Sequence, residues 1–210
     1  MIYLVRHGQT AFNRDGRLQG HVDSELTDLG LEQALAVGER LRALVGEEMG
    51  WRIVASPLGR ARTTAEHIAR ALGGAAVEVH AELTEVSFGA WDGRLREELR
   101  TEYPDAFSPT GYMFTAPACE TYEAVCDRLT AWLAGLEPEP GRRVIAVSHG
   151  VSGRVLRGLY AGLSREAALA LPVPQDAVFR LAGGLIERIE ACPDRLGAGR
   201  RENGRQAAGW

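Results

Sequence analysis

Short, continuous apolar runs constrain the fold of this 210-residue chain more than any other feature of its sequence. Such runs are typical of strands that are buried on both faces, as in parallel sheets. Longer stretches with apolar residues at helical spacing separate them, and this alternation predicts a parallel α/β sheet with helices on both faces. We therefore expect a three-layer α/β/α sandwich with a mainly parallel central sheet. The expected strands are Ile2–Val5, Ile53–Ala55, Val77–Val79, Val144–Val147, Val178–Leu181 and Leu185–Ile189, the last two forming a hairpin through Gly183-Gly184.

The spacing of apolar residues predicts helices between the strands, whereas two other segments show no periodic spacing of apolar residues. Residues 104–119 contain three prolines and a glycine, which predicts a loop or lid. Residues 193–210 are rich in glycine and arginine and are expected to form a C-terminal tail. We find no linker and no repeat, so we expect a single domain over residues 1–210. The expected helices are one that Thr27 caps and that continues to Val45, and the segments 59–72, 94–103, 121–136, 152–160 and 165–171.

Charge and residue usage exclude several classes of function. A formal net charge of -4 gives no basic footprint for nucleic acid, and no apolar run is long enough to cross a bilayer. Three cysteines without a C-x-x-C pair, and no signal peptide pattern at the start, favour a cytoplasmic protein. All 24 basic residues are arginines, which excludes Schiff-base and P-loop lysines. Side chains that bind an anion must therefore be arginine or histidine.

Charged and polar residues follow three of the predicted strands directly. Arg6-His7-Gly8 comes after the first strand, Ser56–Arg60 after the second, and Ser148-His149-Gly150 after the fourth. Because ligands of open α/β sheets bind beyond the carboxyl ends of the strands, we expect these side chains to meet in one crevice. Two histidines, two arginines and helix N-termini at one place indicate a multiply charged anion, above all phosphate.

Other catalytic chemistries lack their motifs in this sequence. H-E-x-x-H, paired C-x-x-C and D-x-D are all missing, so no metal ligands occur at suitable spacing. Gly150-Val151-Ser152-Gly153 is not a G-x-S-x-G nucleophile elbow, and no G-x-G-x-x-G is present. We therefore expect no metal and no cofactor, and histidine remains as the nucleophile.

Five blocks of sequence, in order, carry a resemblance to a known family. Together they resemble the histidine phosphatase superfamily, which includes the phosphoglycerate mutases, over about residues 1–160. The blocks are Leu4–Thr10 with Asn13 and Leu18-Gln19-Gly20; Asp23 with Leu26–Gly30; Ser56–Ala61 with Thr64-Ala65; Leu83-Thr84-Glu85 with Phe88–Gly93; and Ser148–Val151.

The resemblance implies a covalent phosphohistidine on His7, with Arg6, Arg60 and His149 around the phosphate and Glu85 as the proton donor. The family works without a metal, so both arginines and a protonated His149 would have to balance the phosphoryl charge. His7 must stay neutral at its attacking nitrogen, and a hydrogen bond from the other ring nitrogen to a backbone carbonyl would fix that tautomer. The resemblance further implies phosphate or substrate contacts at Gln9, Thr10, Asn13, Gln19, Gly20, Gly150 and Val151.

The composition of the segment after Glu85 distinguishes between a hydrolase and a mutase. A mutase must hold a second anionic group, and the mutases of the family commonly supply cations there, whereas Thr101–Asp127 contains no Arg, Lys or His. We therefore expect a phosphomonoester hydrolase that acts on a small phosphorylated metabolite. Phosphoglycerate mutase-type transfer is the alternative, with Arg14 or Arg17 as the second anion site. A non-catalytic phosphate-sensing or protein-binding relative is disfavoured, because every catalytic position is filled.

Overall fold

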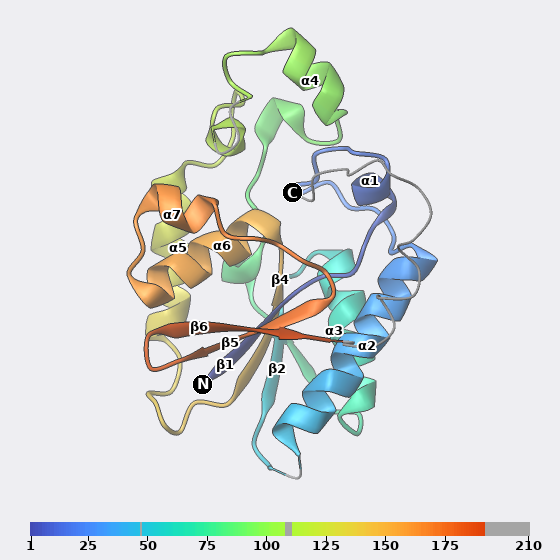
Figure 1. The fold of residues 1–210 in the computed structure, drawn as a ribbon, viewed down its shortest axis with the longest axis vertical. Helices are drawn as coiled ribbons and strands as arrows, with labels where there is room; N and C mark the ends of the chain where they lie inside the picture. The colour runs from blue at the N-terminus through green and yellow to red at the C-terminus, as the bar shows by residue number, and fades with distance from the viewer. Residues whose placement is uncertain (47, 108–110, 192–210) are drawn as a thin grey trace.

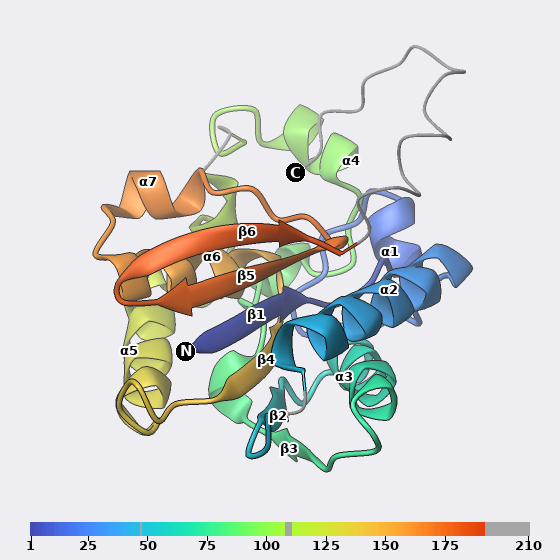
Figure 2. The ribbon, with the colours of Figure 1, turned by 60° about the horizontal axis from the view of Figure 1, so that its bottom comes forward.

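A six-stranded sheet in the order β3-β2-β4-β1-β5-β6 forms the centre of the molecule (Figure 1). The computed structural model describes residues 1–46, 48–107 and 111–191, so the expected tail at 193–210 lies outside the described residues. The first four strands in that order run parallel, and the β5–β6 hairpin adds two antiparallel strands at one edge (Figure 2). All six predicted strands are confirmed: β1 (Ile2–Arg6), β2 (Arg52–Ala55), β3 (Val77–Val79), β4 (Val144–Ser148), β5 (Ala177–Ala182) and β6 (Leu185–Glu190).

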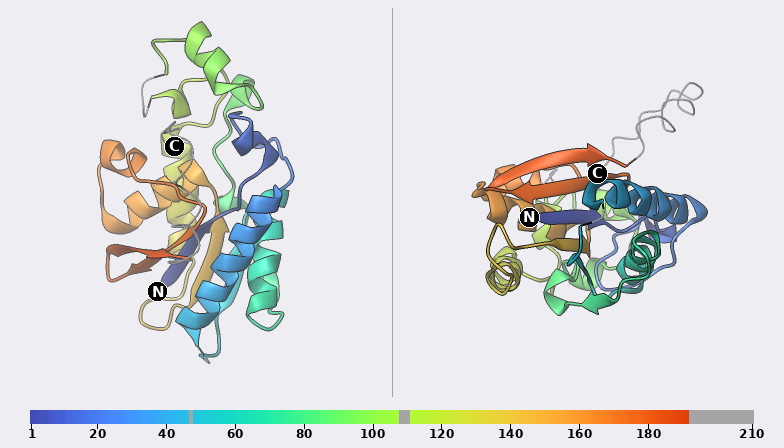
Figure 3. Two further views of the ribbon diagram at one scale, coloured as in Figure 1. Left: turned by 45° about the vertical axis from the view of Figure 1, so that its right-hand side comes forward. Right: turned by 90° about the horizontal axis from the view of Figure 1, so that it is seen from below.

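Helices cover both faces of this sheet, as the three-layer prediction requires. α2 and α3 lie together on one face, and α5 and α6 lie on the other (Figure 3). None of the described helices is long and apolar enough to cross a membrane. The α-helices are α1 (Ala11–Arg14), α2 (Asp28–Val45), α3 (Gly59–Ala71), α4 (Arg96–Glu102), α5 (Tyr122–Ala134), α6 (Gly150–Ala161) and α7 (Arg165–Leu169); single 3₁₀ turns occur at Ala81–Leu83, Gly89–Trp91 and Tyr112–Phe114.

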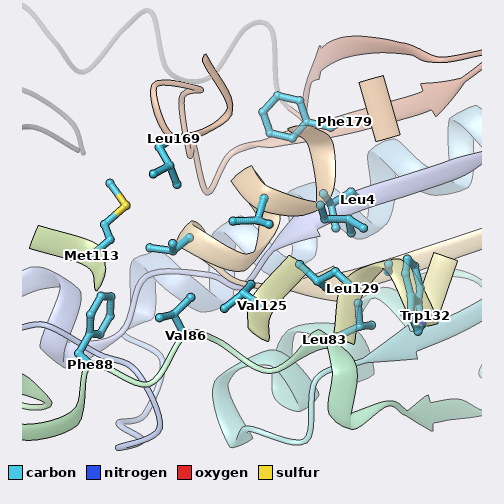
Figure 4. Close-up of a cluster of buried hydrophobic side chains, with 14 of the residues drawn as sticks. Leu4, Leu83, Val86, Phe88, Met113, Val125, Leu129, Trp132, Leu169 and Phe179 are labelled. Atoms are coloured by element: carbon cyan, nitrogen blue, oxygen red, sulfur yellow. The ribbon is translucent and has the colours of Figure 1, made fainter. Parts of the chain in front are cut away.

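The alternation of side chains along β1 divides the core into two clusters. Tyr3 and Val5 pack with α2 and α3, whereas Ile2 and Leu4 face the helices on the other side (Figure 4 shows Leu4 in that second cluster). Every one of these four side chains is at most 4% exposed. Burying a large apolar side chain contributes about 1.5–3 kcal/mol, so the strand that carries the site is held firmly from both faces.

Helix α6 begins two residues earlier than the sequence predicts. His149 is its N-cap residue, and the helix starts at Gly150 rather than at Ser152. The backbone N–H groups at the start of α6 therefore lie directly beside the histidine. This early start brings the positive end of the helix into the crevice at the strand ends.

The predicted loop at 104–119 packs against the body of the protein through its aromatic side chains. Where it is described, it contains the 3₁₀ turn Tyr112–Phe114. The Phe107 and Tyr112 rings stack with centroids 4.9 Å apart, and Phe107 lies 5.6 Å from the Trp91 ring. Met113 is buried, which anchors the turn. That this segment acts as a lid stays a prediction.

Candidate active site

The carboxyl ends of β1, β2 and β4 meet as the sequence predicts. The backbone N–H of His7 donates to the Ser148 carbonyl at 3.1 Å. Nε2 of His149 lies 2.7 Å from the hydroxyl of Ser56, and the two histidine rings lie 5.1 Å apart. Residues from three separate parts of the chain thus surround one point, and both histidines are almost completely buried.

The ring of His7 is held in a single tautomer. Its Nδ1 lies 2.8 Å from the Gly8 carbonyl, which only accepts hydrogen bonds, so Nδ1 carries the proton and Nε2 keeps its lone pair. Nε of Arg60 donates to that Nε2 at 3.3 Å. Burial, and then the charges of Arg60 and Arg6, lower the pKa of His7 well below its usual 6.5. At neutral pH the imidazole is therefore uncharged, with a lone pair on Nε2.

Gly8 is required by a close approach between two backbones. A Cβ atom at this position would lie 2.2 Å from the Gly30 carbonyl oxygen near the start of α2. The Gly8 N–H donates to the Thr64 hydroxyl at 3.1 Å, and that hydroxyl donates to the Arg60 carbonyl at 2.8 Å. The turn after His7 is therefore fixed to both α2 and α3.

Arg60 is a buried cation with a fixed orientation. Its side chain forms an ion pair with Asp23 at 3.0 Å and donates to the Gly20 carbonyl at 2.7 Å. Asp23 also accepts a hydrogen bond from the Gly59 N–H at the start of α3. These contacts fix the orientation of the guanidinium, whose Nε points at His7.

Buried arginines also hold the segment that precedes β5. Arg6 donates to the Val173 carbonyl, Arg154 to the Leu171 carbonyl, and Arg157 to the Pro172 carbonyl, each at 2.6 Å. Desolvation lowers the pKa of Arg6 to about 10, and its buried Nε has no hydrogen-bond partner within the described part of the chain. That free donor is available to an anion.

The carboxyl group of Glu85 lies at the N-terminus of α6. It accepts hydrogen bonds from the backbone N–H groups of Val151 at 3.1 Å, Ser152 at 2.8 Å and Val86 at 3.0 Å. A Cβ on Gly150 would lie 3.6 Å from both Glu85 Oε2 and Arg6 Nε, so these two groups border the same small space. Without a substrate, the Val151 N–H that we expected to contact substrate is used by Glu85.

His149 is a buried, neutral imidazole in the protein without a bound anion. Burial, together with the charges of Arg60, His7 and Arg6, lowers the pKa of His149 well below 6.5. In the protein without a bound anion the residue is therefore neutral, because burial and the nearby arginines disfavour another positive charge. Its protonation opposite a phosphoryl group stays a prediction. Its buried Nδ1 has no partner within the described residues and can donate to or accept from a bound group.

A pocket at the strand ends brings together most of the predicted residues. The amide oxygen of Asn13 accepts a hydrogen bond from Gln175 at 2.9 Å, and Gln19 is held by Ser24 at 3.0 Å. The pocket is lined by Arg6, His7, Asn13, Gln19, Glu85, Phe88, Arg96, Tyr112, Gly150, Val151, Arg154 and Val173.

Two predicted contact residues have other partners. Gln9 accepts a hydrogen bond from the Thr27 hydroxyl at 2.9 Å, on the side of α2. Thr10 caps α1, and its hydroxyl donates to Gln19 at 2.7 Å. Their visible role is to position the loop that carries Asn13 and Gln19.

Two arginines that no sequence motif singled out also line the pocket, Arg96 and Arg154. Arg154 follows His149 by slightly more than one helical turn, and this spacing was the available signal. Arg96 is the first residue of α4 and lies just before residues 101–127, the segment whose lack of basic residues favours a hydrolase. Arg14 and Arg17, the alternative second anion site, do not line this pocket: Arg14 pairs with Asp15 on the surface, and Arg17 donates to the Gly93 carbonyl. Their role in a mutase stays a prediction.

No group of three or more histidine, cysteine or carboxylate side chains suited to a metal ion occurs among residues 1–46, 48–107 and 111–191. The charges that lower the pKa of His7 are those of Arg60 and Arg6, which would also repel a cation at its ring.

Comparison with known proteins decides the family. The profile of the histidine phosphatase superfamily (branch 1) matches residues 2–183. The chain belongs to this superfamily. A probable phosphoglycerate mutase GpmB of Salmonella paratyphi C is 35% identical over 194 residues, which cover 90% of this chain and 84% of the relative.

Solved structures of the superfamily agree with this fold. The mycobacterial glucosyl-3-phosphoglycerate phosphatase, in complex with VO3, superimposes with a TM-score of 0.71 at 29% identity over 90% of this chain and 96% of its own. An open reading frame product of Mycobacterium tuberculosis superimposes with a TM-score of 0.72 at 27% identity, covering 90% and 94% of the two chains. Similar proteins thus include members named for phosphatase and for mutase activity.

Proposed function

We propose that this protein is a phosphomonoester hydrolase that works through a phosphohistidine at Nε2 of His7 and needs no metal. The observation that carries the proposal is the state of His7: its Nδ1 donates to Gly8, its pKa is lowered, and Arg60 lies at the free Nε2. A neutral imidazole beside two buried guanidinium groups suits attack on a phosphoryl group that those groups bind.

The reaction takes two steps. Nε2 of His7 attacks phosphorus and the P–O bond to the leaving group breaks, while Glu85 gives its proton to the departing oxygen. A water molecule then attacks the phosphoryl group, the P–N bond breaks, and the water proton passes to Glu85 as phosphate leaves. Arg6 and Arg60 balance the phosphoryl charge in both steps, which replaces the usual contribution of Mg²⁺.

Phosphoglycerate mutase-type transfer remains the second candidate. The name of the curated relative and the two additional arginines in the pocket favour it. The phosphatase name of the mycobacterial neighbour, and a segment 101–127 without basic residues, favour hydrolysis. A mutase returns the phosphoryl group to a second hydroxyl, whereas a hydrolase gives it to water.

A panel of phosphomonoesters separates the candidates, with released phosphate and transferred phosphate measured in parallel. We expect phosphate release that persists in the presence of a chelator. Phosphoryl transfer that greatly exceeds phosphate release would favour the mutase. Activity that disappears on chelation and returns with Mg²⁺ or Zn²⁺ would overturn the metal-free mechanism. A failure to hydrolyse any ester, nitrophenyl phosphate included, would overturn the hydrolase.

A further inference from the structure

Ser56 has a fully buried hydroxyl that the two reaction steps do not use. The residue follows β2 directly, and its backbone N–H donates to the Val147 carbonyl at 3.0 Å. The hydroxyl is therefore held at the carboxyl end of the sheet. Its oxygen lies 2.7 Å from Nε2 of His149, so one of these two atoms must donate a hydrogen bond to the other.

A second contact of the hydroxyl decides the direction of that bond. The backbone N–H of Leu58 donates to the same Ser56 oxygen at 3.3 Å. This bond uses a lone pair of the oxygen and leaves the O–H to donate elsewhere. Among the residues that the structure describes, the hydroxyl has no hydrogen-bond partner besides Leu58 and His149. The Ser56 hydroxyl therefore donates, and Nε2 of His149 accepts.

The other ring nitrogen of His149 must then carry the proton of the neutral ring. This Nδ1 is buried and has no hydrogen-bond partner within the described part of the chain. A buried N–H without an acceptor is costly, so it points to an oxygen of a ligand. Nε of Arg6 is a second buried donor without a partner, and the charge of Arg6 acts on both histidine rings. Two neighbouring residues thus each offer a donor beside the nucleophile.

A doubly protonated ring does not suit these contacts. Nε2 would then donate as well, and the Ser56 oxygen would accept from both Leu58 and His149. Its own O–H would be left without an acceptor among the described residues. Burial of the ring disfavours its protonation most, and the nearby charged and titratable groups act in the same direction; they are Arg60, His7, Arg6 and Arg128.

We propose that Ser56 is a positioning residue whose hydroxyl holds His149 uncharged with the proton on Nδ1, so that Nδ1–H donates to a phosphoryl oxygen. The inference rests on the proposed function and deepens it, because it assigns how His149 takes part in that reaction. The charge of the phosphoryl group is then balanced by Arg6 and Arg60, and His149 adds a directed hydrogen bond.

NMR of the wild-type protein labelled with ¹⁵N-histidine tests the tautomer directly. The signals of His149 are assigned by their loss in His149→Gln. At about pH 8 we expect a protonated, pyrrole-type Nδ1 and an unprotonated, pyridine-type Nε2, both without ligand and with saturating inorganic phosphate. The Nδ1 signal should move when phosphate is added. An unprotonated Nδ1, or two protonated nitrogens in the phosphate complex, would overturn the proposal.

Ser56→Ala removes the hydroxyl and lets the neutral ring carry its proton on either nitrogen. At about pH 8, phosphoenzyme formation in a single turnover at saturating substrate should slow by about 10-fold or more, the range of one lost hydrogen bond to a charged group. Ser56→Thr keeps a hydroxyl and should restore most of the rate and the pyridine-type Nε2.

The pH profile separates this role from a structural one. A bound dianion favours protonation of His149, and a protonated ring carries a proton on Nδ1 whether or not Ser56 is present. The ratio of the wild-type rate to the Ser56→Ala rate should therefore decrease as the pH falls toward about 5. A ratio that stays the same at every pH would indicate a packing defect and would overturn the proposal. If Ser56→Ala does not fold, the wild-type NMR spectrum still decides.

The matched control is Ser148→Ala. Ser148 is equally buried and adjoins His149 in the sequence, but its hydroxyl donates to the Leu83 carbonyl at 2.9 Å. Its substitution should leave both ring nitrogens of His149 unchanged, and any loss of rate should not depend on pH. Equal changes of the ring signals in Ser148→Ala and Ser56→Ala would overturn the specific role of Ser56.

Hydrolysis of nitrophenyl phosphate separates failure of this inference from failure of the proposed function. If the wild-type protein hydrolyses that ester while Nε2 of His149 carries the proton, the hydrolase stands and the role of Ser56 falls. If Nδ1 carries the proton and responds to inorganic phosphate while no ester is hydrolysed, the role of Ser56 stands and the hydrolase falls.

Discussion

The two sides of the pocket differ in how their arginines are balanced. On the phosphoryl side, Arg60 is paired with Asp23, bound to the Gly20 carbonyl and aimed at His7. On the side of Glu85, the proposed proton donor to the leaving group, Arg96 and Arg154 line the pocket and form no ion pair among the described residues. The first side has an ion pair within the protein, whereas the arginines of the second side have none among the described residues. We therefore expect the chemistry to depend on the ends of the parallel strands, and selectivity to depend on α4 and α6.

This comparison predicts two kinds of kinetic loss. Substitutions on the phosphoryl side should slow all substrates alike, because every substrate carries the same phosphoryl group. Substitutions on the leaving-group side should slow the reaction of some substrates more than that of others, depending on the chemistry of the leaving group.

Glu85→Gln should show the largest selective effect. An alkoxide needs a proton as the P–O bond breaks, so phosphoenzyme formation from an alkyl phosphate should slow by about 10²–10⁴-fold. Nitrophenolate leaves without help, so nitrophenyl phosphate should slow only weakly. Single-turnover formation of the phosphoenzyme is the measurement, because Glu85 also assists the later attack of water.

Asp92→Asn is the matched control for the proton donor. Asp92 accepts hydrogen bonds from the backbone N–H groups of Gly20 and His21 at the same rim, so it positions that loop. Its substitution should show no dependence on the leaving group. Equal losses for both esters in Glu85→Gln would remove Glu85 from the proton-donor role.

Arg60→Ala should cause a loss that is the same for every ester. Removing one preorganised donor costs about 3 kcal/mol of transition-state stabilisation, or about 10²-fold in kcat/KM. Arg62→Ala, an exposed position on the same helix, should leave kcat/KM unchanged. A loss in Arg60→Ala that varied strongly between alkyl and nitrophenyl esters would break the division into two sides.

The free energy of unfolding should depend on pH through the buried histidines, and this effect is smaller than the kinetic losses above. The pKa values of His7 and His149 are lowered below 6.5 in the folded protein. Below pH 6.5 the unfolded chain therefore binds protons that the folded protein does not, and stability falls as the pH decreases toward the folded pKa. Each histidine accounts for up to about 1.4 kcal/mol per pH unit.

His7→Gln removes one of these contributions. Between about pH 7.5 and about pH 5.5, the free energy of unfolding of the variant should rise by about 1 kcal/mol relative to that of the wild-type protein. Denaturant unfolding in phosphate-free buffer measures the difference. A difference between the two proteins that did not change with pH would contradict the buried, neutral state of His7.

The positions of the strands along the chain, and the mainly parallel sheet, could be predicted from the sequence because buried strands need nearly continuous apolar runs. Three of those runs are followed directly by the charged and polar residues that lie together at the candidate active site. Helix α1 was not predicted, since Ala11–Arg14 is too short to show a period and depends on the cap that Thr10 provides.

Other features of the site depend on contacts that no sequence pattern displays. Arg96 and Arg154 reach the pocket because α4 is fixed to the loop at Gly16 and α6 begins at Gly150. The neutral state of His149 results from burial beside Arg60, which only the folded arrangement creates. Gln9 and Thr10 resemble contact residues, but their side chains bind Thr27 and Gln19.

Trapping the phosphorylated protein tests the central claim most directly. The wild-type protein is mixed with a ³²P-labelled phosphomonoester for less than one turnover, quenched in base and mapped by peptide. We predict a phosphoryl group that is acid-labile and base-stable, at up to one per chain, on the peptide that contains His7. In His7→Ala the label should be absent, and kcat should be at least about 10⁴-fold lower than in the wild-type protein. Turnover by the wild-type protein without any labelled peptide, or with the label on a different residue, would contradict the account.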